Sequence, residues 1–393
     1  MKNKAVILGA NYYIGLSTIR CLGKNGVVVA AVDYSDNGAY GFRSKYCSEK
    51  LIGPHYKENS KAFLEFLIDY AKKQDASPVL IPCADPYVEF VDTYLYELKE
   101  YFLIPQTKKG LYTELMNKEK LHSLASLMNV KVPETIRLTE DNYIEKIETI
   151  LKYPCIVKPV DSPAFVSTFR RKMFKVNDRK ELVEAIDKAK KAGLEVIVQR
   201  IIPGFDDHMY TFDAYLNQEA KVTNWLTCQK YRQYPINFGA SVYTGQKYVQ
   251  ELYDIGAKFL EGVGFKGFAE IEFKKDAVTG DFYLIEVNVR ITNLNSLLEK
   301  VGVNMPYLTY MELTGEKIEP QEIKKDTGLV FWYAYEDFLA IRGYVKTKQL
   351  KTSDIIRSLF RPKAYAIWDI SDSKPFFEFN GILMKKVFRK LFK

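Results

Sequence analysis

The sequence predicts a multidomain protein that combines an α/β domain with α+β domains. Its N-terminal part reads as alternating strands and helices around a glycine-containing turn, which is typical of a parallel sheet covered by helices. A later hairpin pattern carries a row of polar side chains on otherwise apolar strands. At 393 residues, with 47% hydrophobic and 27% charged residues, the chain has room for about two or three folded domains.

The N-terminal part of the chain reads as a β-α-β unit. An apolar strand at Lys4–Leu8 leads into a turn, a helix at Ser17–Lys24 and a second strand at Val27–Val32. The turn contains Gly9 and Gly15 in a G-x5-G spacing, so the G-x-G-x-x-G fingerprint of dinucleotide-binding sites is absent. The turn and the following helix N-terminus are still suited to a small anion.

The alternation of strands and helices continues to about residue 105. We expect a helix at Lys57–Lys73, a strand at Pro78–Cys83 and a helix at Pro86–Tyr101. Asp85 follows the end of this strand, where open α/β sheets bind their ligands. The same residue is equally suited to cap the next helix, and the sequence leaves both roles open.

From about Gln106 the sequence changes to an α+β pattern. Helices are predicted at Asn117–Val130 and Asn142–Leu151, and a short apolar strand then ends in Lys158. A lysine at a strand end either extends into solvent or faces an anion, and the strand alone does not decide between them. The polar and basic run Val160–Arg171 is expected to be a loop.

A break in the chain follows the next predicted strand, at Glu195–Gln199. Pro203 and Gly204 interrupt the pattern beside acidic residues, and strand alternation resumes at Met209–Leu216. A hinge of this kind is suited to a nucleotide base and ribose, whereas the alternative interpretation is an ordinary surface turn.

The most informative stretch is FYLIEVNVR, at Phe282–Arg290. The apolar residues of a buried strand alternate there with Glu286, Asn288 and Arg290. Alternate residues of a strand point to the same face, so a carboxylate, an amide and a guanidinium line one surface about 7 Å apart. Such a row is costly to bury without a partner.

An upstream strand at Gly267–Phe273, followed by a polar turn, predicts a hairpin that brings Glu272 beside Glu286. Two facing carboxylates repel each other unless a cation lies between them. Carboxylate and amide oxygens suit Mg2+ or Mn2+, and the adjacent Arg290 suits a phosphate or carboxylate held against the metal. The alternative is a surface strand with a salt bridge, but the apolar flanking residues indicate burial and therefore favour the metal site.

The charge and cysteine content narrow the class of protein. The formal charge of +8 fits anionic ligands such as nucleotides or an anionic membrane surface, and no nucleic-acid-binding module is recognisable. The five cysteines are scattered and form no C-x-x-C pair, which is typical of reduced cytosolic thiols. The N-terminus runs directly into a strand pattern and no apolar run is long enough to span a bilayer, so we expect a cytoplasmic protein.

The order and approximate spacing of these motifs resemble the ATP-grasp superfamily. The glycine-turn domain is followed by NKEK, YPCIVKP, VIVQRIIPG, GFAEIEF and YLIEVNVR. The resemblance covers about residues 1–314 and implies an ATP-grasp fold with an N-terminal Rossmann-like domain. The implied divisions are 1–105, 106–315 (a lid lobe at about 110–200 and a metal-binding lobe at about 201–315) and a C-terminal extension at 316–393. Within the superfamily, the sequence looks most like the carboxylate-amine ligases that include D-aspartate ligase of cell-wall precursor synthesis.

Carried over residue by residue, the resemblance implies roles in nucleotide, metal and substrate binding. The matched positions are Lys118 and Lys158 for the ATP phosphates; Gln199, Arg200 and Ile202 for the adenine; Asp206 or Asp207 for the ribose; Glu272, Glu286 and Asn288 for Mg2+; and Arg290 for the transferred phosphate or acyl phosphate. Lys230 and Arg232 fall where related enzymes present basic residues to the substrate carboxylate, and a solvated charged turn is the alternative for that pair.

The chain departs from the common family pattern in two ways. Gln199 and Arg200 stand where many members have acidic residues, although a glutamine carbonyl can accept the hydrogen bond of an adenine amino group. The run Val160–Arg171 lacks the glycines that often form the loop covering the ATP phosphates. We therefore expect basic side chains to contribute more to phosphate binding there than backbone amides do.

The implied chemistry is phosphoryl transfer from ATP to a carboxylate, followed by attack of an amine on the acyl phosphate to give an amide, ADP and phosphate. The small lobe would close as a lid to exclude water. The three histidines form no triad or metal-binding spacing. A non-catalytic ATP-binding regulator of the same fold is one alternative. A nicotinamide-dependent oxidoreductase is the other, and the missing third glycine counts against it.

The C-terminal tail NGILMKKVFRKLFK has an amphipathic pattern. Its apolar residues are predicted to share a helical face opposite its basic residues: Ile382, Leu383, Val387, Phe388, Leu391 and Phe392 against Lys385, Lys386, Arg389 and Lys390. A basic amphipathic end can lie on an anionic membrane. A helix packed on the protein, or a frayed terminus, is the alternative.

Overall fold

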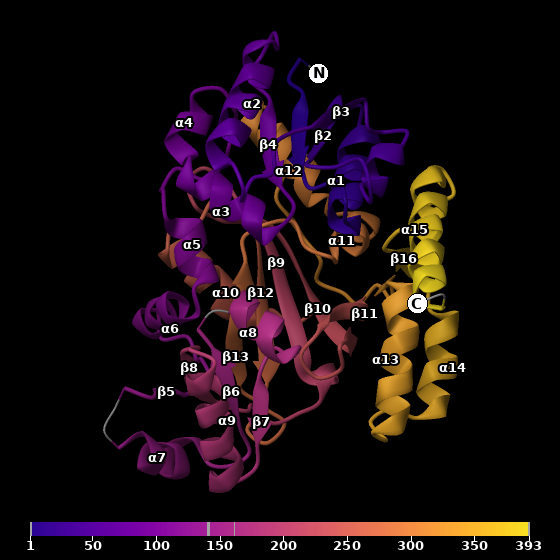
Figure 1. The fold of residues 1–393 in the computed structure, drawn as a ribbon. Coiled ribbons are helices and arrows are strands. Elements are labelled where there is room, and N and C mark those ends of the chain that lie inside the picture. The colour runs from indigo at the N-terminus through magenta and orange to yellow at the C-terminus, as the bar shows by residue number, and fades with distance from the viewer. Residues whose placement is uncertain (1, 140–141, 161, 392–393) are drawn as a thin grey trace.

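The structure is a computed structural model that describes residues 2–139, 142–160 and 162–391. Three β-sheets organise these residues. Figure 1 shows the N-terminal domain at the top, the largest sheet in the centre, a small lobe at the lower left and the C-terminal helices at the right. None of the described helices combines the length and the apolar composition that are needed to cross a membrane.

The N-terminal domain contains a four-stranded parallel sheet in the order β3-β2-β1-β4. Its elements are β1 (Ala5–Leu8), α1 (Tyr13–Gly23), β2 (Val29–Asp33), η1 (Tyr40–Arg43), β3 (Glu49–Ile52), α2 (Ser60–Lys72), β4 (Val79–Pro82), α3 (Asp85–Thr93) and α4 (Leu95–Lys99). The predicted β-α-β unit is therefore confirmed. Gly15, in the first turn of α1, has to be a glycine because a Cβ atom there would lie 1.8 Å from the carbonyl oxygen of Gly9.

The small lobe contains a four-stranded antiparallel sheet in the order β5-β8-β6-β7. The elements from the domain junction through the lobe are α5 (Leu111–Met116), α6 (Lys118–Leu127), β5 (Thr135–Arg137), α7 (Tyr143–Lys146), η2 (Ile147–Leu151), β6 (Cys155–Pro159), α8 (Ser162–Phe169), β7 (Phe174–Val176), α9 (Arg179–Lys191) and β8 (Val196–Arg200). The lobe has a hydrophobic core of its own.

The prediction of a loop at Val160–Arg171 is wrong, because α8 occupies Ser162–Phe169. Asp161 lies outside the described residues. The physical reason is tertiary: Phe165 is buried, and its ring packs 4.7 Å from that of Phe169 and 5.1 Å from that of Phe174, centroid to centroid. This aromatic cluster stabilises a helix in a run that has no strong periodic pattern of its own.

The central sheet has eight strands, seven of them in the order β13-β12-β9-β10-β11-β15-β16, with β14 beside β10. Its elements and their covering helices are η3 (Asp206–His208), β9 (Met209–Leu216), β10 (Val222–Tyr234), β11 (Ala240–Gln246), α10 (Gln250–Gly262), β12 (Gly267–Lys275), β13 (Phe282–Asn288), α11 (Asn295–Val301), α12 (Met305–Leu313), β14 (Gln321–Glu322), β15 (Val330–Trp332), α13 (Ala334–Lys346), α14 (Thr352–Phe360), β16 (Lys363–Tyr365) and α15 (Lys374–Leu391). Because β14, β15 and β16 belong to this sheet, the segment after residue 316 shares one sheet with the residues before it.

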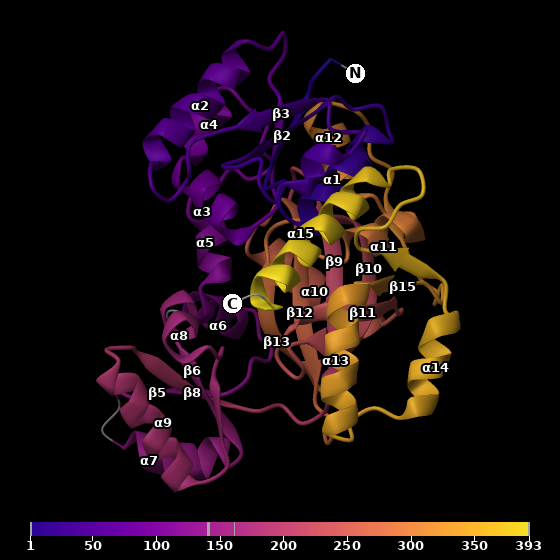
Figure 2. The same cartoon turned by 45° about the vertical axis from the view of Figure 1, so that its right-hand side comes forward.

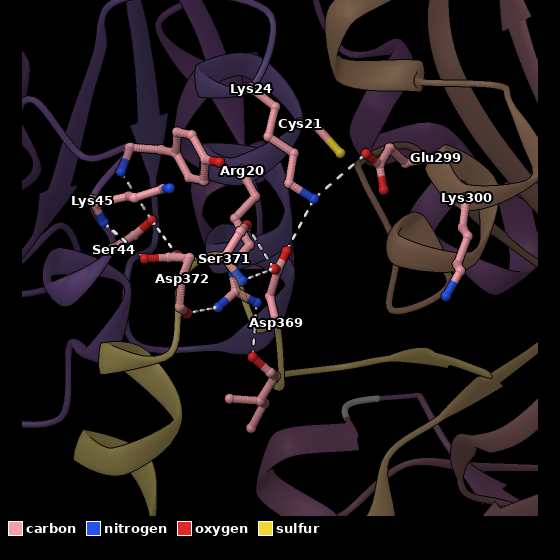
Figure 3. Close-up of polar contacts among 12 residues, drawn as sticks. Arg20, Cys21, Lys24, Ser44, Lys45, Glu299, Lys300, Asp369, Ser371 and Asp372 are labelled. Carbon is pink, nitrogen blue, oxygen red and sulfur yellow. Dashed lines mark hydrogen bonds and ion pairs between the residues drawn. The ribbon is translucent and has the colours of Figure 1, made fainter.

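A buried ion pair, shown in Figure 3, connects the loop that precedes α15 to the N-terminal domain. Arg20 of α1 donates from Nε to Asp372 Oδ2 at 2.9 Å, and its two Nη atoms donate to the backbone carbonyls of Ile367 and Asp372. Asp372 also accepts hydrogen bonds from Ser44 Oγ and the backbone N–H of Lys45. The chain end is therefore positioned over the domain in which the chain begins.

Candidate functional site

A cavity of about 920 Å³ is lined by side chains from the N-terminal domain, the small lobe and the central sheet. Most of the residues singled out in the sequence line it. The lining includes Tyr12, Tyr13 and Asp85 from the N-terminal domain; Lys118, Lys158, Gln199, Arg200 and Ile202 from the small lobe; and Asp206, Glu272, Glu286, Asn288 and Arg290 from the central part of the chain.

The predicted hairpin is confirmed, and its register brings the acidic residues together. Strands β12 and β13 pair antiparallel with Glu272 opposite Glu286 and with Glu270 opposite Asn288. Asp213 of the next strand, β9, lies opposite Glu270 on its other side. Because paired residues share a face, these oxygen-rich side chains form one polar surface across three strands.

This surface fits a hard divalent cation. Asn288 donates from Nδ2 to Glu270 Oε1 at 2.9 Å, which leaves its amide oxygen available as a ligand beside Glu272 and Glu286. Among the described residues, no three Asp, Glu, His or Cys side chains form a metal-binding cluster. The fit therefore depends on the mixed set of two carboxylates and one amide oxygen, which suits Mg2+.

Burial and mutual repulsion control the protonation of this surface. Burial, reinforced by the charge of Asp213, raises the pKa of Glu270 to about 8. Burial likewise raises the pKa of Asp213 to about 7, although a hydrogen bond from Thr211 opposes the shift. A neutral acid in this pair removes the repulsion that two adjacent buried carboxylates would otherwise have.

Lys230 lies beside the acidic surface. It is buried within β10, and its Nζ lies 2.6 Å from Glu272 Oε1, so it contacts a carboxylate of the protein itself. Burial opposes its charge, but the carboxylates of Glu272 and Glu270 outweigh that effect and raise its pKa. The alternative of a solvated turn is therefore wrong for Lys230, which is a buried cation behind the acidic surface, and its contact with a substrate carboxylate stays a prediction.

Arg232 of the same strand also has a carboxylate partner within the protein. It is buried, donates to both carboxylate oxygens of Asp337 at 2.6 and 2.7 Å, and lies 3.9 Å from the ring centroid of Tyr243. Irregular pairing of β10 with β11 on both sides of Arg232 directs it toward α13. The alternative of a solvated turn is wrong, because β10 continues to Tyr234, and the guanidinium already has a carboxylate partner in Asp337; its contact with a substrate stays a prediction.

Two lysines of the small lobe form the cationic side of the cavity. Asn117 caps α6 by accepting from two backbone N–H groups, which places Lys118 at the first position of the helix. Lys158 at the end of β6 donates to Gln199 Oε1 at 2.6 Å. Burial, followed by the charge of Lys118, lowers the pKa of Lys158 to about 8, and Glu286 opposes this shift. Two partly buried and mutually repelling cations favour an anion between them.

The strand end that was predicted to hold the adenine is largely occupied by internal contacts. Gln199 accepts from Lys158 and donates to Thr135 Oγ1 at 2.9 Å, so its side chain is already engaged. The guanidinium of Arg200 lies 3.2 Å from Glu134 and 3.0 Å from Asp276. Any contact of this segment with a base would therefore use backbone groups rather than these two side chains.

The two ribose candidates differ in their surroundings. Asp206 is buried, lines the cavity and accepts from the backbone N–H of Asn237 at 2.8 Å and from the hydroxyl of Tyr344 on α13. Asp207 is more exposed and contacts His208 Nδ1 at 2.7 Å. Tyr344 links the C-terminal segment to the cavity wall.

Arg290 and Asp85, both singled out by the sequence, contact each other in the cavity wall. Arg290 donates from Nε to Asp85 Oδ1 at 2.5 Å, so Asp85 orients this guanidinium and does not cap α3, whose cap position is Ala84. The hydroxyls of Ser241 and Thr292, which the sequence did not single out, also lie in the cavity wall, and that of Ser241 is buried without a hydrogen-bond partner among the described residues. An unsatisfied buried hydroxyl costs about 1–3 kcal/mol, which a bound ligand could recover. No motif marks these positions in the sequence.

Comparison with known proteins agrees with this geometry. Residues 124–308 match the family described as the D-ala D-ala ligase C-terminus. The chain is 27% identical over 299 residues to a D-aspartate ligase of Enterococcus faecium, covering 69% of this chain and 70% of that protein. It is 25% identical over 206 residues to a D-alanine–D-alanine ligase of Pseudomonas putida, covering 50% of this chain and 62% of that protein.

Solved structures show the same fold. An N5-carboxyaminoimidazole synthetase of Staphylococcus aureus complexed with ADP superposes with a TM-score of 0.63 at 17% identity, covering 82% of this chain and 80% of that one. A biotin carboxylase domain of Hydrogenobacter thermophilus, in complex with MgADP and bicarbonate, superposes with a TM-score of 0.65 at 15% identity, covering 84% and 74%. The chain has the ATP-grasp fold, and these similarities support an ATP-grasp carboxylate-amine ligase. The small lobe and the hairpin of β12 and β13 lie on two sides of the cavity.

Proposed function

We propose that this ligase uses ATP to activate an amino-acid carboxylate as an acyl phosphate and then joins it to an amine, releasing ADP and phosphate. The observation that carries the proposal is the arrangement across the cavity. Lys118 and Lys158 of the small lobe act electrostatically on Glu286 of the hairpin, and Arg290 lies on the hairpin side of the same cavity. Cations facing a candidate metal site are the arrangement that phosphoryl transfer requires.

Each residue in this arrangement has a separate task in the proposed reaction. The two lysines bind the ATP phosphates, and Arg290, oriented by Asp85, stabilises the negative charge of the phosphoryl group as it moves to the substrate carboxylate. Mg2+ held by Glu272, Glu286 and Asn288 would supply further neutralisation between the phosphates. Closure of the small lobe would keep water from the acyl phosphate.

The substrate proposal is an amino acid, with D-aspartate as the first candidate. The D-aspartate ligase relative supports this choice. So do the buried hydroxyls of Ser241 and Thr292, which line the same cavity as Arg290 and can donate to a carboxylate. The amine acceptor is proposed to belong to a cell-envelope precursor, and the reaction to occur in the cytoplasm.

A second candidate function is an ATP-binding regulator without turnover. One observation favours it: Lys230 already holds an oxygen of Glu272, one of the proposed metal ligands. A protein in which this contact replaces the metal would still bind ATP through its lysines. Measured ADP release separates the two functions.

The experiment that tests the proposal measures Mg2+-dependent ADP release from the purified full chain. The assay uses a panel of L- and D-amino acids with and without a peptidoglycan precursor peptide. Glu286→Gln removes a proposed metal ligand, and Glu219→Gln in an exposed turn is the matched control. Release that requires one amino acid plus the acceptor, and that is lost only in Glu286→Gln, supports the ligase. ATP binding without release under every combination supports the regulator.

A further inference from the structure

The positive charge of this chain is concentrated at its C-terminal end. Residues 334–393 contain 13 of the 57 Lys and Arg residues but only 6 of the 49 Asp and Glu residues. This segment therefore accounts for +7 of the formal net charge of +8. A charge asymmetry of this size indicates an anionic partner for the segment.

Helix α15 packs on the protein with only one of its faces. Phe376, Phe379 and Ile382 pack against the hydrophobic core that includes Tyr40, and the rings of Phe379 and Tyr40 are 5.4 Å apart, centroid to centroid. The predicted alternative of a helix packed on the protein is thus correct for this inner face. Ile382 is part of it, so the tail does not present all its apolar residues on one free face.

The outer face of α15 carries a second apolar stripe. Phe377, Met384 and Phe388 are 64%, 59% and 53% exposed, and their spacing of seven and four residues places them on one side of the helix. Figure 2 shows α15 at the front of the molecule, with no other element in front of it. Large apolar side chains in such a row mark a contact surface.

A basic groove of about 640 Å³ runs beside this stripe, between α15 and the segment from η1 to β3. Its cations come from two distant parts of the chain: Arg43, Lys45 and Lys50 from the N-terminal domain, and Lys374 and Lys385 from α15. Glu378 is the acidic residue that lines it. Within the described ranges, Lys50, Lys374 and Lys385 have no ion-pair partner. The unpaired lysines of the groove therefore favour the binding of anions.

We propose that the outer face of α15 and this basic groove together bind the anionic surface of a lipid bilayer. A bilayer has a partner for the apolar stripe and for the basic groove. Its acyl region accepts Phe377 and Met384, and its phosphates approach the lysines of the groove. A free phosphate would use only the cations. A second copy of the chain would bring another segment with a charge of +7 against the first, which is unfavourable.

Membrane binding would hold the ligase beside lipid-linked acceptors, and to that extent the inference deepens the proposed function. The two can nevertheless fail separately. Lipid binding is measured without turnover, and ADP release is measured without lipid.

The test is co-sedimentation of the full chain with vesicles of phosphatidylcholine alone or mixed with phosphatidylglycerol. We expect binding only to the anionic vesicles, and release at high salt. Each lysine near an anionic surface strengthens binding about fivefold, so Lys374→Glu with Lys385→Glu should weaken it at least about 25-fold. Phe377→Ser with Met384→Ser should weaken it without changing the net charge.

A control with the same change in charge distinguishes this face from general electrostatic attraction. Lys188→Glu with Lys191→Glu alters two exposed lysines of α9 in the small lobe, and it should leave vesicle binding within about twofold of wild type. Equal losses in both double variants, or no binding of wild type to anionic vesicles, would overturn the proposal. So would light scattering that shows a dimer dispersed by Phe377→Ser with Met384→Ser, because the face would then be a protein interface.

Discussion

Asp372→Ala tests how the C-terminal segment is joined to the N-terminal domain. The Asp372 carboxylate accepts from Arg20 Nε at 2.9 Å, Ser44 Oγ at 2.6 Å and the backbone N–H of Lys45 at 2.9 Å (Figure 3). The side chains of Arg20 and Asp372 are only 7% and 1% exposed. The substitution leaves a buried guanidinium whose remaining acceptors are the backbone carbonyls of Ile367 and residue 372.

The expected magnitude follows from this geometry. Removing one partner of a buried ion pair costs about 3–5 kcal/mol, because the other charge stays buried without compensation. The two retained carbonyl contacts place the expected loss of unfolding free energy at the lower end, about 3 kcal/mol. At about 2 °C per kcal/mol, the thermal midpoint should fall by about 6 °C. Thermal unfolding followed by circular dichroism measures the fall, and limited proteolysis should show earlier cleavage before α15.

Asp369→Ala is the matched control on the same loop. Asp369 lies 3.0 Å from Lys24 in a pair whose side chains are 19% and 31% exposed, so its loss should cost only about 0–1 kcal/mol. If Asp372→Ala lowers the midpoint no more than Asp369→Ala does, the reasoning from burial is refuted. The double variant Arg20→Met with Asp372→Leu should regain most of the lost stability, since no charge is left buried.

Four further predictions concern the cavity and its wall. Asp337→Asn leaves the Arg232 guanidinium buried beside a neutral partner, so denaturant unfolding should show a loss of about 3 kcal/mol; unchanged stability with a raised KM would instead return Arg232 to substrate binding. Because burial lowers the pKa of Lys158 to about 8, ATP affinity should weaken as pH rises above that value, with proton uptake on binding seen by calorimetry and absent in Lys158→Met. The unfolding free energy of the free protein should rise between pH about 8 and the ordinary lysine pKa of 10.5, since the unfolded state binds the proton more tightly there. Glu270→Leu removes the acceptor of the Asn288 amide, and the apparent Mg2+ affinity should fall by about 10- to 100-fold, whereas an unchanged Mg2+ titration would rule out that orienting role.

Local patterns in the sequence were sufficient to predict the hairpin of the candidate site. The alternation around Glu286 and Asn288 predicts a strand with one polar face, and the short polar turn predicts its partner strand. The register that sets Glu272 opposite Glu286 follows from those two local facts. The glycine turn that follows the first strand was predictable for the same reason, because only neighbouring residues determine it.

The partners of the buried charges could not be read from the sequence. Lys230 and Arg232 share one motif, yet one reaches Glu272 in the central sheet and the other reaches Asp337 on α13. Irregular pairing in β10 separates them, and a strand pattern does not record such an irregularity. The helix within 160–171 was missed because its stability comes from the aromatic cluster around Phe165.

The sequence by itself determined which strands and turns form and which faces of them are polar, because backbone periodicity and turn chemistry depend on neighbouring residues. Only the tertiary structure decided which charge meets which. Arg290 pairs with Asp85, which is 205 residues away in the sequence, and Arg20 pairs with Asp372, which is 352 residues away. A buried ionic group must find a partner wherever the fold brings one close, and that choice depends on how the sheets and helices pack rather than on the pattern around either residue.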